Sequence, residues 1–273
     1  MCDTAAFLKD RELRGLSANT IRFYRTYLNQ WETRLASRTN GDSPAALLRQ
    51  WIDSLSPQTG AAVFRAVRAL ELFAEASGGE RSWIHDCQGW KFRPAPIPQA
   101  LDQARFEKIL AQLDLSLWPD RRDFAVLSVL WHTGARSGAV LGLRVEDVDL
   151  TARTLNIQTK GGVKAPIVLP AAAVPIVQEW LPQCGGAYVF PATKDRSAPL
   201  NRDWLSRRFR DLARAAGIRR RVWIHLLRHS WACRMLDQGV SVAAVSRQLT
   251  HTTWTMTQRY ARISLGRVRQ EIG

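Results

Sequence analysis

The first part of the chain carries apolar residues at the spacing of amphipathic helices. In LSANTIRFYRTYLNQWETRLASR one stripe consists of Ile21, Tyr24, Leu28, Trp31 and Leu35. These positions recur as on one face of a helix, and Ser17 or Asn19 can cap its start. Similar patterns predict a second helix over 45–55 and a third over 58–76, which Gly78–Gly79 would end. We therefore expect an all-helical amino-terminal part.

The second part of the chain predicts helices on both sides of one short β-hairpin. Leu155 and Ile157 alternate with polar neighbours in TARTLNIQTK, GlyGly turns the chain, and KAPIVLP returns, which is the pattern of two paired strands. Lys160 then lies near the turn. The helical patterns are LDQARFEKILAQL, RRDFAVLSVLWHTG, DWLSRRFRDLARAAG, IHLLRHSWACRMLDQG, SVAAVSRQL and residues 254–263. The fold class we predict is mainly α with a small β-sheet (α+β).

A proline-rich segment separates the two parts. KFRPAPIPQAL, residues 91–101, has three prolines in five residues, a density that breaks helices and favours an extended connector. A polyproline ligand for another protein is the rival interpretation, although proline-rich linkers are commoner. We predict a helical domain over 1–92, a linker over 93–100 and a second domain over 101–273.

The charge balance favours a polyanionic partner. The 273 residues include 39 Lys and Arg against 24 Asp and Glu, which gives a net charge of +15. This excess is +2 over 1–92 and +13 over 93–273, so the second part should hold most of the contacts. Only six of the basic residues are lysine. Arginine's planar fork suits phosphate, while genomic base composition is an equally good explanation of the bias.

Composition narrows the class of protein further. Hydrophobic residues make up 46% of the chain, enough to bury a core and to exclude wholesale disorder. No stretch approaches the roughly 20 apolar residues of a membrane span, and the amino terminus lacks the apolar run of a secretory signal. Nucleic acid is therefore favoured over a membrane surface as the polyanion.

The cysteines indicate a reduced, cytoplasmic protein. Cys2, Cys87, Cys184 and Cys233 are far apart and form no CxxC pair. Cys233 has two histidines nearby in the sequence, but a zinc site needs about four ligands. We expect no disulfide, no metal and no cofactor.

Arginine and histidine at helical spacing are the strongest local candidates for chemistry. His225 and Arg228 are three residues apart in HLLRH, so on a helix they share a face, with His229 rotated further round. A guanidinium and an imidazole that point the same way can both meet one phosphate. The first supplies forked donors, and the second supplies a donor or takes up a proton.

Four further residues are candidates only in combination. Taken alone, Arg136 and Lys160 are ordinary surface charges, His251 is a cap or core residue, and Tyr260 is a packing residue. Their ordered conjunction with the HLLRH pair is what chance rarely supplies.

In these segments the chain resembles a tyrosine recombinase of the phage-integrase family, which includes the Xer recombinases. TGARSGAVLGLRVEDVDL, TKGGVKAPIVLP, HLLRHSWACRMLDQGVSVAAVSRQLTH and TMTQRYARIS carry the likeness, which covers about residues 100–265. RGLSANTIRFYRTYL also resembles the family's helical core-binding domain. The resemblance implies two domains that form a C-shaped clamp around DNA. The positions that match the family's catalytic residues are Arg136, Lys160, His225, Arg228, His251 and Tyr260.

The resemblance also implies a mechanism, which is DNA strand exchange through a covalent protein–DNA link. Tyr260 would attack the scissile phosphate, release a 5′ hydroxyl and leave a 3′-phosphotyrosyl bond, so that rejoining needs no ATP. His225 would act as general base or acid, and Lys160 would protonate the departing 5′ oxygen. The remaining three would stabilise charge on the phosphate without a metal: Arg136, Arg228 and His251.

The implied partner is double-stranded DNA that carries a recombination site, with a homo-tetramer in the synaptic complex and accessory proteins left open. The tail 261–273 either docks on a neighbouring subunit or packs on its own domain. The arginines of RDWLSRRFRDLARAAGIRRR should contact phosphates, which makes affinity fall steeply with salt. They are Arg202, Arg207, Arg208, Arg210, Arg219, Arg220 and Arg221.

Two positions depart from the family pattern. Ala139 stands where an acidic residue is usual, and Thr250 stands where a glycine usually precedes the second histidine. Ala139 removes a partner expected to orient Arg136 or its helix. The alternative functions are a non-catalytic DNA-binding regulator derived from a recombinase and a type IB topoisomerase-like strand transferase. Integration and excision of mobile DNA are the family-wide expectation, and dimer resolution is the nearest alternative.

Overall fold

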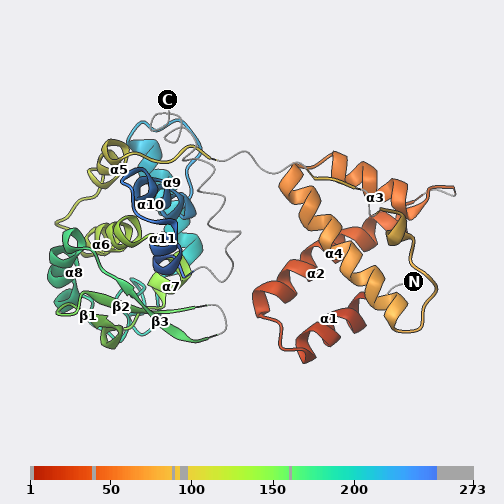
Figure 1. Cartoon of the computed structure of the whole chain (residues 1–273), viewed down its shortest axis with the longest axis horizontal. Coiled ribbons are helices and arrows are strands. Elements are labelled where there is room, and N and C mark those ends of the chain that lie inside the picture. Colours follow the sequence, from red (N-terminus) through yellow and green to blue (C-terminus); the bar gives the residue numbers. More distant parts are fainter. Residues whose placement is uncertain (1–2, 39–40, 88–89, 93–97, 160–161, 251–273) are drawn as a thin grey trace. The chain divides into compact units, whose positions relative to one another are not determined.

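The structure, a computed structural model, describes residues 3–38, 41–87, 90–92, 98–159 and 162–250. It divides into two compact units, residues 1–97 and 98–273, and each is described here by itself (Figure 1). Residues 93–97 of the expected 93–100 linker lie outside the described residues, so the linker stays a prediction.

In its described residues, the first unit has four α-helices and one short 3-10 helix. Ser17, Ser43 and Ser56 each begin a helix by accepting a hydrogen bond from the backbone N–H three residues on. The apolar faces meet in one core around Trp31 and Leu28, which are fully buried. The elements are α1 (Thr4–Leu13), α2 (Ala18–Ala36), α3 (Pro44–Asp53), α4 (Pro57–Ala76) and η1 (Trp83–Cys87).

The predicted helices of this unit are confirmed to within two residues. The stripe that begins at Ile21 is α2, and Gly78, with a φ of 96°, follows the end of α4 as expected. The sequence analysis missed α1 and η1. In α1 only Thr4 and Phe7 are buried, so this helix lacks the repeated apolar stripe on which the prediction depends.

The second unit packs helices against a three-stranded antiparallel sheet, which lies along one side of the unit (Figure 1). Its strands are β1 (Val148–Asp149), β2 (Thr154–Gln158) and β3 (Lys164–Val168). Its α-helices are α5 (Gln103–Leu110), α6 (Trp118–Thr133), α7 (Ser137–Leu141), α8 (Val174–Trp180), α9 (Arg202–Ala215), α10 (His225–Asp237) and α11 (Val242–Gln248). Its 3-10 helices are η2 (Val145–Asp147), η3 (Ala171–Ala173) and η4 (Leu181–Gln183).

The sheet is the expected hairpin with one extra short strand. β2 pairs with β3 so that Leu155 lies opposite Ile167, and both side chains are buried. The alternation seen in the sequence therefore faces the core. β1, α7 and α8 were not predicted. The fold class, mainly helical with a small sheet, is confirmed.

Helix α6 crosses the core of this unit and is buried on most of its surface. Its one fully buried arginine, Arg122, donates two hydrogen bonds to Asp123 Oδ1, at 3.1 and 2.9 Å, and one to the carbonyl of Pro191 at 3.0 Å. The guanidinium also lies over the rings of Trp118 and Trp204, at 5.5 and 5.1 Å from their centroids. Buried charge on α6 is thus paired, as the low dielectric of a core demands.

Three expectations about the chain as a whole concern membrane spans, cysteines and metal ions. Among the residues described, no helix has the length and apolar character needed to cross a membrane. Cys87, Cys184 and Cys233 are buried free thiols, and Cys2 lies outside the described residues. Within the same described set, no group of three or more His, Cys, Asp or Glu could hold a metal ion.

Candidate active site

Gly134, which has a left-handed backbone conformation, ends α6 two residues before Arg136. Gly134 has a φ of 65° and ends the helix, and a Cβ there would lie 2.6 Å from the ring of Trp231 on α10. Only glycine fits this combination of backbone and space. Two residues later Arg136 starts the short helix α7 as its N-cap. The close approach of α6 and α10 thus fixes where Arg136 leaves the core.

Helix α10 contributes Arg228, which points toward the same region. Its side chain is only 3% exposed, and it donates hydrogen bonds to the carbonyls of Gly134 at 3.0 Å and Leu249 at 2.7 Å. The first carbonyl belongs to the end of α6 and the second to the end of α11. Arg228 therefore joins three segments that are distant in the sequence.

Arg136 contacts the residue that follows Leu249. Its Nη1 donates to Thr250 Oγ1 at 2.9 Å and to the Thr250 carbonyl at 3.3 Å, across 114 positions of sequence. The two guanidinium groups therefore converge on the dipeptide Leu249–Thr250. Two fixed positive charges at one place form a site suited to a phosphate group.

His225 belongs to the same group of side chains. It is the first residue of α10. Desolvation by the surrounding protein, followed by the positive charges of Arg228 and Arg136, lowers the pKa of His225 from 6.5 to about 4. The imidazole is accordingly neutral at pH 7 and able to accept a proton.

His229 does not share this role, although it follows in the same HLLRH motif. Its side chain is 7% exposed, and its Nε2 lies 2.7 Å from the carbonyl of Pro98. Burial lowers the pKa of His229. The ring ties α10 to the segment that enters α5, as its greater rotation around the helix allows.

Gln248 connects the hairpin to the arginine site. Its side-chain amide accepts from the N–H of Val168 at 2.9 Å and donates to the Val168 carbonyl at 2.8 Å. The same amide nitrogen lies 3.4 Å from the carbonyl of Thr133 at the end of α6. Gln248 therefore pairs with the backbone at the edge of β3 and holds this strand next to the end of α6, which closely precedes Arg136 in the sequence. Sequence reasoning missed this residue, since no motif marks it.

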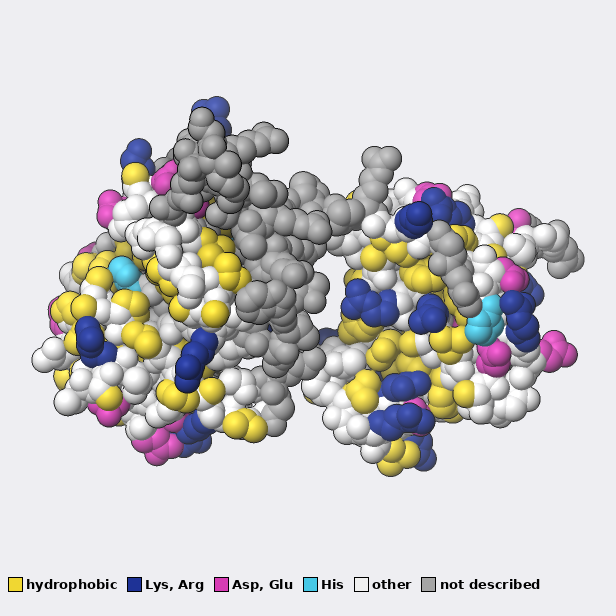
Figure 2. Space-filling model, in the orientation of Figure 1, with side chains coloured by type: hydrophobic (Ala, Val, Ile, Leu, Met, Phe, Trp, Pro, Cys, Tyr) yellow, Lys and Arg dark blue, Asp and Glu magenta, His cyan; other side chains and the backbone are white. Residues whose placement is uncertain are grey.

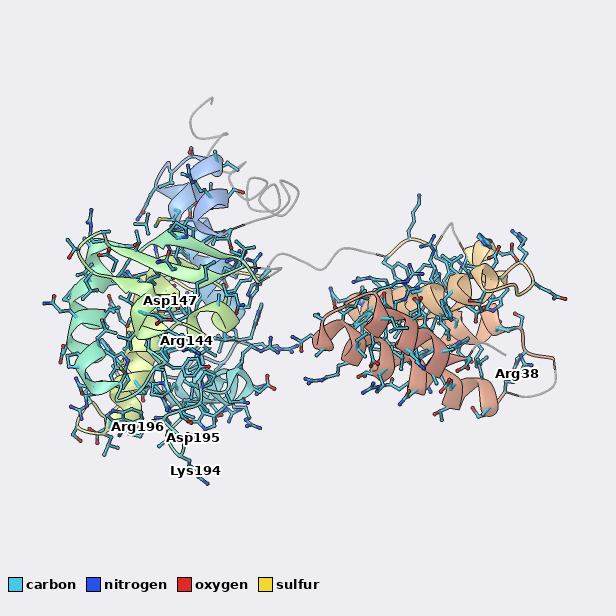
Figure 3. The ribbon with its side chains drawn as sticks, turned by 90° about the horizontal axis from the view of Figure 1, so that it is seen from below. Arg38, Arg144, Asp147, Lys194, Asp195 and Arg196 are labelled. Carbon is cyan, nitrogen blue, oxygen red and sulfur yellow. The ribbon has the colours of Figure 1, made fainter. Side chains whose placement is uncertain are left out.

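The hairpin has a second lysine, Lys164, which forms an ion pair with the buried Asp147. Asp147 also accepts a hydrogen bond from the backbone N–H of Arg144 at 3.1 Å. Figure 3 labels Asp147 and Arg144 in the second unit. The hairpin lysine left as a candidate for chemistry is Lys160. Lys160, His251 and Tyr260 lie outside the described residues, as do the predicted helix 254–263 and the tail.

Two of the arginines predicted to contact DNA serve the fold of their own unit. Arg208 lies 2.8 Å from Asp120 and 3.4 Å from Asp123, which holds α9 against α6. Arg220 donates to the carbonyls of Gln99 and Ala100 at 2.6 and 2.8 Å. The other five are exposed: Arg202, Arg207, Arg210, Arg219 and Arg221.

Comparison with known proteins gives a consistent family signal. A model of the phage integrase family matches residues 99–266. Tyrosine recombinase XerD of Mycobacterium tuberculosis is 29% identical over 94% of this chain and 91% of its own length. The structure of XerH recombinase bound to palindromic difH substrate, a post-cleavage complex, is similar over 100% of this chain and 84% of that one, with 20% identity and a TM-score of 0.79. A lambda integrase tetramer bound to a Holliday junction is similar over 94% and 75%, with 20% identity and a TM-score of 0.74.

Proposed function

The chain belongs to the phage integrase family and is a tyrosine recombinase that cuts and rejoins DNA, and we propose that its nucleophile is Tyr260. Attack of the Tyr260 hydroxyl oxygen on the scissile phosphorus forms a 3′-phosphotyrosyl bond and breaks the bond to the 5′ oxygen. Return of a 5′ hydroxyl reverses these two changes. Because one phosphodiester is exchanged for another, no ATP is needed.

The observation that carries this proposal is the convergence of Arg136 and Arg228 on Leu249–Thr250. A pentavalent phosphorane has more negative charge on its nonbridging oxygens than the diester from which it forms. A positive charge about 4 Å away contributes on the order of 4 kcal/mol at an effective dielectric near 20. Each 1.4 kcal/mol of preferential stabilisation is about tenfold in rate, so two guanidinium groups supply a large part of the acceleration.

We assign to His225 the role of the base that removes the proton from the Tyr260 hydroxyl. A free tyrosine has a pKa of about 10, so at neutral pH the hydroxyl needs a base. The pKa of His225, about 4, keeps the imidazole neutral at pH 7, so that it can accept this proton. In the rejoining step His225 gives the proton back to the oxygen of Tyr260. His251 donates a hydrogen bond to the phosphate, and Lys160 protonates the departing 5′ oxygen.

DNA binding is proposed to use both units. In the first unit Arg65 of α4 lies over the ring of Phe23 of α2, 5.8 Å from its centroid, with exposed Arg22 and Arg68 on the same two helices. Figure 2 shows Lys and Arg side chains among apolar ones on one face of this unit. We assign it the core-binding role in a clamp around the duplex. The exposed arginines of α9 and the loop after it would contact phosphates from the second unit.

Assembly and biological setting follow from strand exchange. Two duplexes must each be cut on both strands, which takes four active sites and therefore a homo-tetramer on DNA. We propose integration and excision of a mobile element as the setting, with dimer resolution as the second candidate. We also propose a cytoplasmic location, where the protein would meet its DNA substrate.

The test uses a duplex selected by binding from a random library and then nicked near the cleavage position, so that the cut strand is lost and the covalent complex accumulates. The wild-type chain should form a protein–DNA adduct, Tyr260→Phe should form none while it binds the duplex equally well, and Tyr188→Phe should behave as wild type. An adduct of normal yield in Tyr260→Phe would refute the assignment. A wild-type chain that binds but forms no adduct would favour the regulator. Relaxation of supercoiled plasmid without the selected site would favour the topoisomerase-like alternative.

A further inference from the structure

Thr250 has a backbone conformation that its side chain disfavours. Its φ is 50°, in the left-handed region, and the only other non-glycine residue in the described part of the chain with a positive φ is Arg153. A residue branched at Cβ is strained there by on the order of 1–2 kcal/mol. Glycine would adopt the same backbone without strain. Retention of threonine at this place therefore calls for a compensating contact.

The compensating contact is with Arg136. One guanidinium nitrogen, Nη1, donates to both the hydroxyl and the carbonyl of Thr250, at 2.9 and 3.3 Å. The left-handed turn brings these two oxygens of one residue onto the same donor. Arg228 meanwhile donates to the carbonyl of the preceding residue, Leu249, at 2.7 Å. The Leu249–Thr250 turn thus sets the spacing between the two guanidinium groups.

We propose that Thr250 is a positioning residue that aims Arg136 at the scissile phosphate. This role rests on the proposed function. A guanidinium has five N–H donors, and the bond to Thr250 leaves most of them for phosphate oxygens. A hydroxyl fixes the orientation of the guanidinium without adding charge. A carboxylate in the same place would orient Arg136 too, but its negative charge would weaken the attraction to DNA.

The same contact accounts for Ala139. An acidic side chain three residues after Arg136 was expected to orient that arginine, and alanine stands there on α7. Thr250 supplies an acceptor from the turn after α11 instead. The proposed role of Thr250 thus links the two positions that depart from the family pattern.

The experiment compares Thr250→Val with Thr250→Ser. Valine keeps the branched Cβ but has no hydroxyl, whereas serine keeps the hydroxyl. Adduct formation is followed in a single turnover at saturating nicked duplex, and DNA affinity is measured separately. We expect Thr250→Ser to react within about threefold of wild type and Thr250→Val about 10–100-fold more slowly, since a hydrogen bond to a charged group is worth that much. Affinity for the duplex should change by less than about threefold in both.

A double-mutant cycle with Arg136→Ala separates positioning from general damage to the fold. If Thr250 acts through Arg136, the difference in rate between the valine and serine variants disappears once Arg136 is alanine. Thr250→Gly should remain slow, although it relieves the backbone strain. Equal rates for the valine and serine variants, or a difference that survives in the Arg136→Ala background, would overturn this role and leave Tyr260 in place. A wild-type chain without an adduct would instead overturn the proposed function.

Discussion

Gln248 offers a measurable link between the hairpin and the arginine site. Its amide makes two hydrogen bonds to Val168 on β3 and one to Thr133 on α6. Each of the two shorter bonds, those to Val168, contributes about 0.5–1.5 kcal/mol net, so Gln248→Leu should lower the free energy of unfolding by about 1–3 kcal/mol. Gln248→Glu should do at least as much damage, because a carboxylate would face the carbonyls of Val168 and Thr133 where an amide now donates.

The structural readout is hydrogen exchange of the Val168 N–H. β3 is an edge strand, and this N–H has the Gln248 side chain as its partner, so exchange should accelerate in Gln248→Leu. Denaturant unfolding supplies the free energy, and Gln238→Leu, an exposed site at the end of α10, is the matched control. Exchange at Val168 and stability both equal to wild type would refute the argument that Gln248 fastens the hairpin.

The functional readout depends on the proposed acid, Lys160. A loosened hairpin should slow adduct formation on an ordinary duplex. The slowing should shrink when the bridging 5′ oxygen is replaced by sulfur, because a thiol with a pKa near 8.5 leaves without a proton. A slowing of the same size on both substrates would mean that Gln248 does not act through the leaving group.

Three further outcomes follow from the structure. Because burial lowers the pKa of His229 below 6.5, the unfolded chain binds the proton more readily; stability should be full above pH 6.5 and fall as the pH drops below it, and a flat unfolding curve between pH 7 and 5 would contradict this. Gly134→Ala should cost about 2–4 kcal/mol in denaturant unfolding, from a φ of 65° and a Cβ 2.6 Å from Trp231, whereas a loss under about 0.5 kcal/mol would mean the helices are not packed as described. Arg208→Ala should lower the free energy of unfolding by about 2–4 kcal/mol, because it removes a partner of buried carboxylates. Arg207→Ala should leave stability unchanged and reduce the salt dependence of DNA binding by about one phosphate contact. The reverse pattern would refute the assignment of the two arginines.

Sequence periodicity predicted the helices that bury one face over several turns and missed several of the shorter elements. Helices α2, α4 and α9 each bury one face, so their apolar residues recur over several turns. Helices α7 and α8 have five and seven residues, which leaves few positions to reveal a period, although α11, with seven, was predicted. Their formation depends on the core against which they pack.

The site divides in the same way. Arg136, His225 and Arg228 could be proposed from sequence because their order and spacing match a family pattern, and the structure brings these three together. Thr250 and Gln248 could not, since their roles arise only when the end of α11 meets the end of α6. Arg207 and Arg208 are adjacent and identical in type, and only the fold shows that the second has carboxylate partners.

The central claim is that one tyrosine hydroxyl becomes bonded to DNA beside the paired guanidinium groups. The chain has four tyrosines: Tyr24, Tyr27, Tyr188 and Tyr260. The most direct measurement digests the trapped protein–DNA adduct with nuclease and protease and locates the residual nucleotide by mass spectrometry. We predict a nucleotide attached through its 3′ phosphate to the peptide that contains Tyr260. A nucleotide on any other residue, or attached through a 5′ phosphate, would contradict the account.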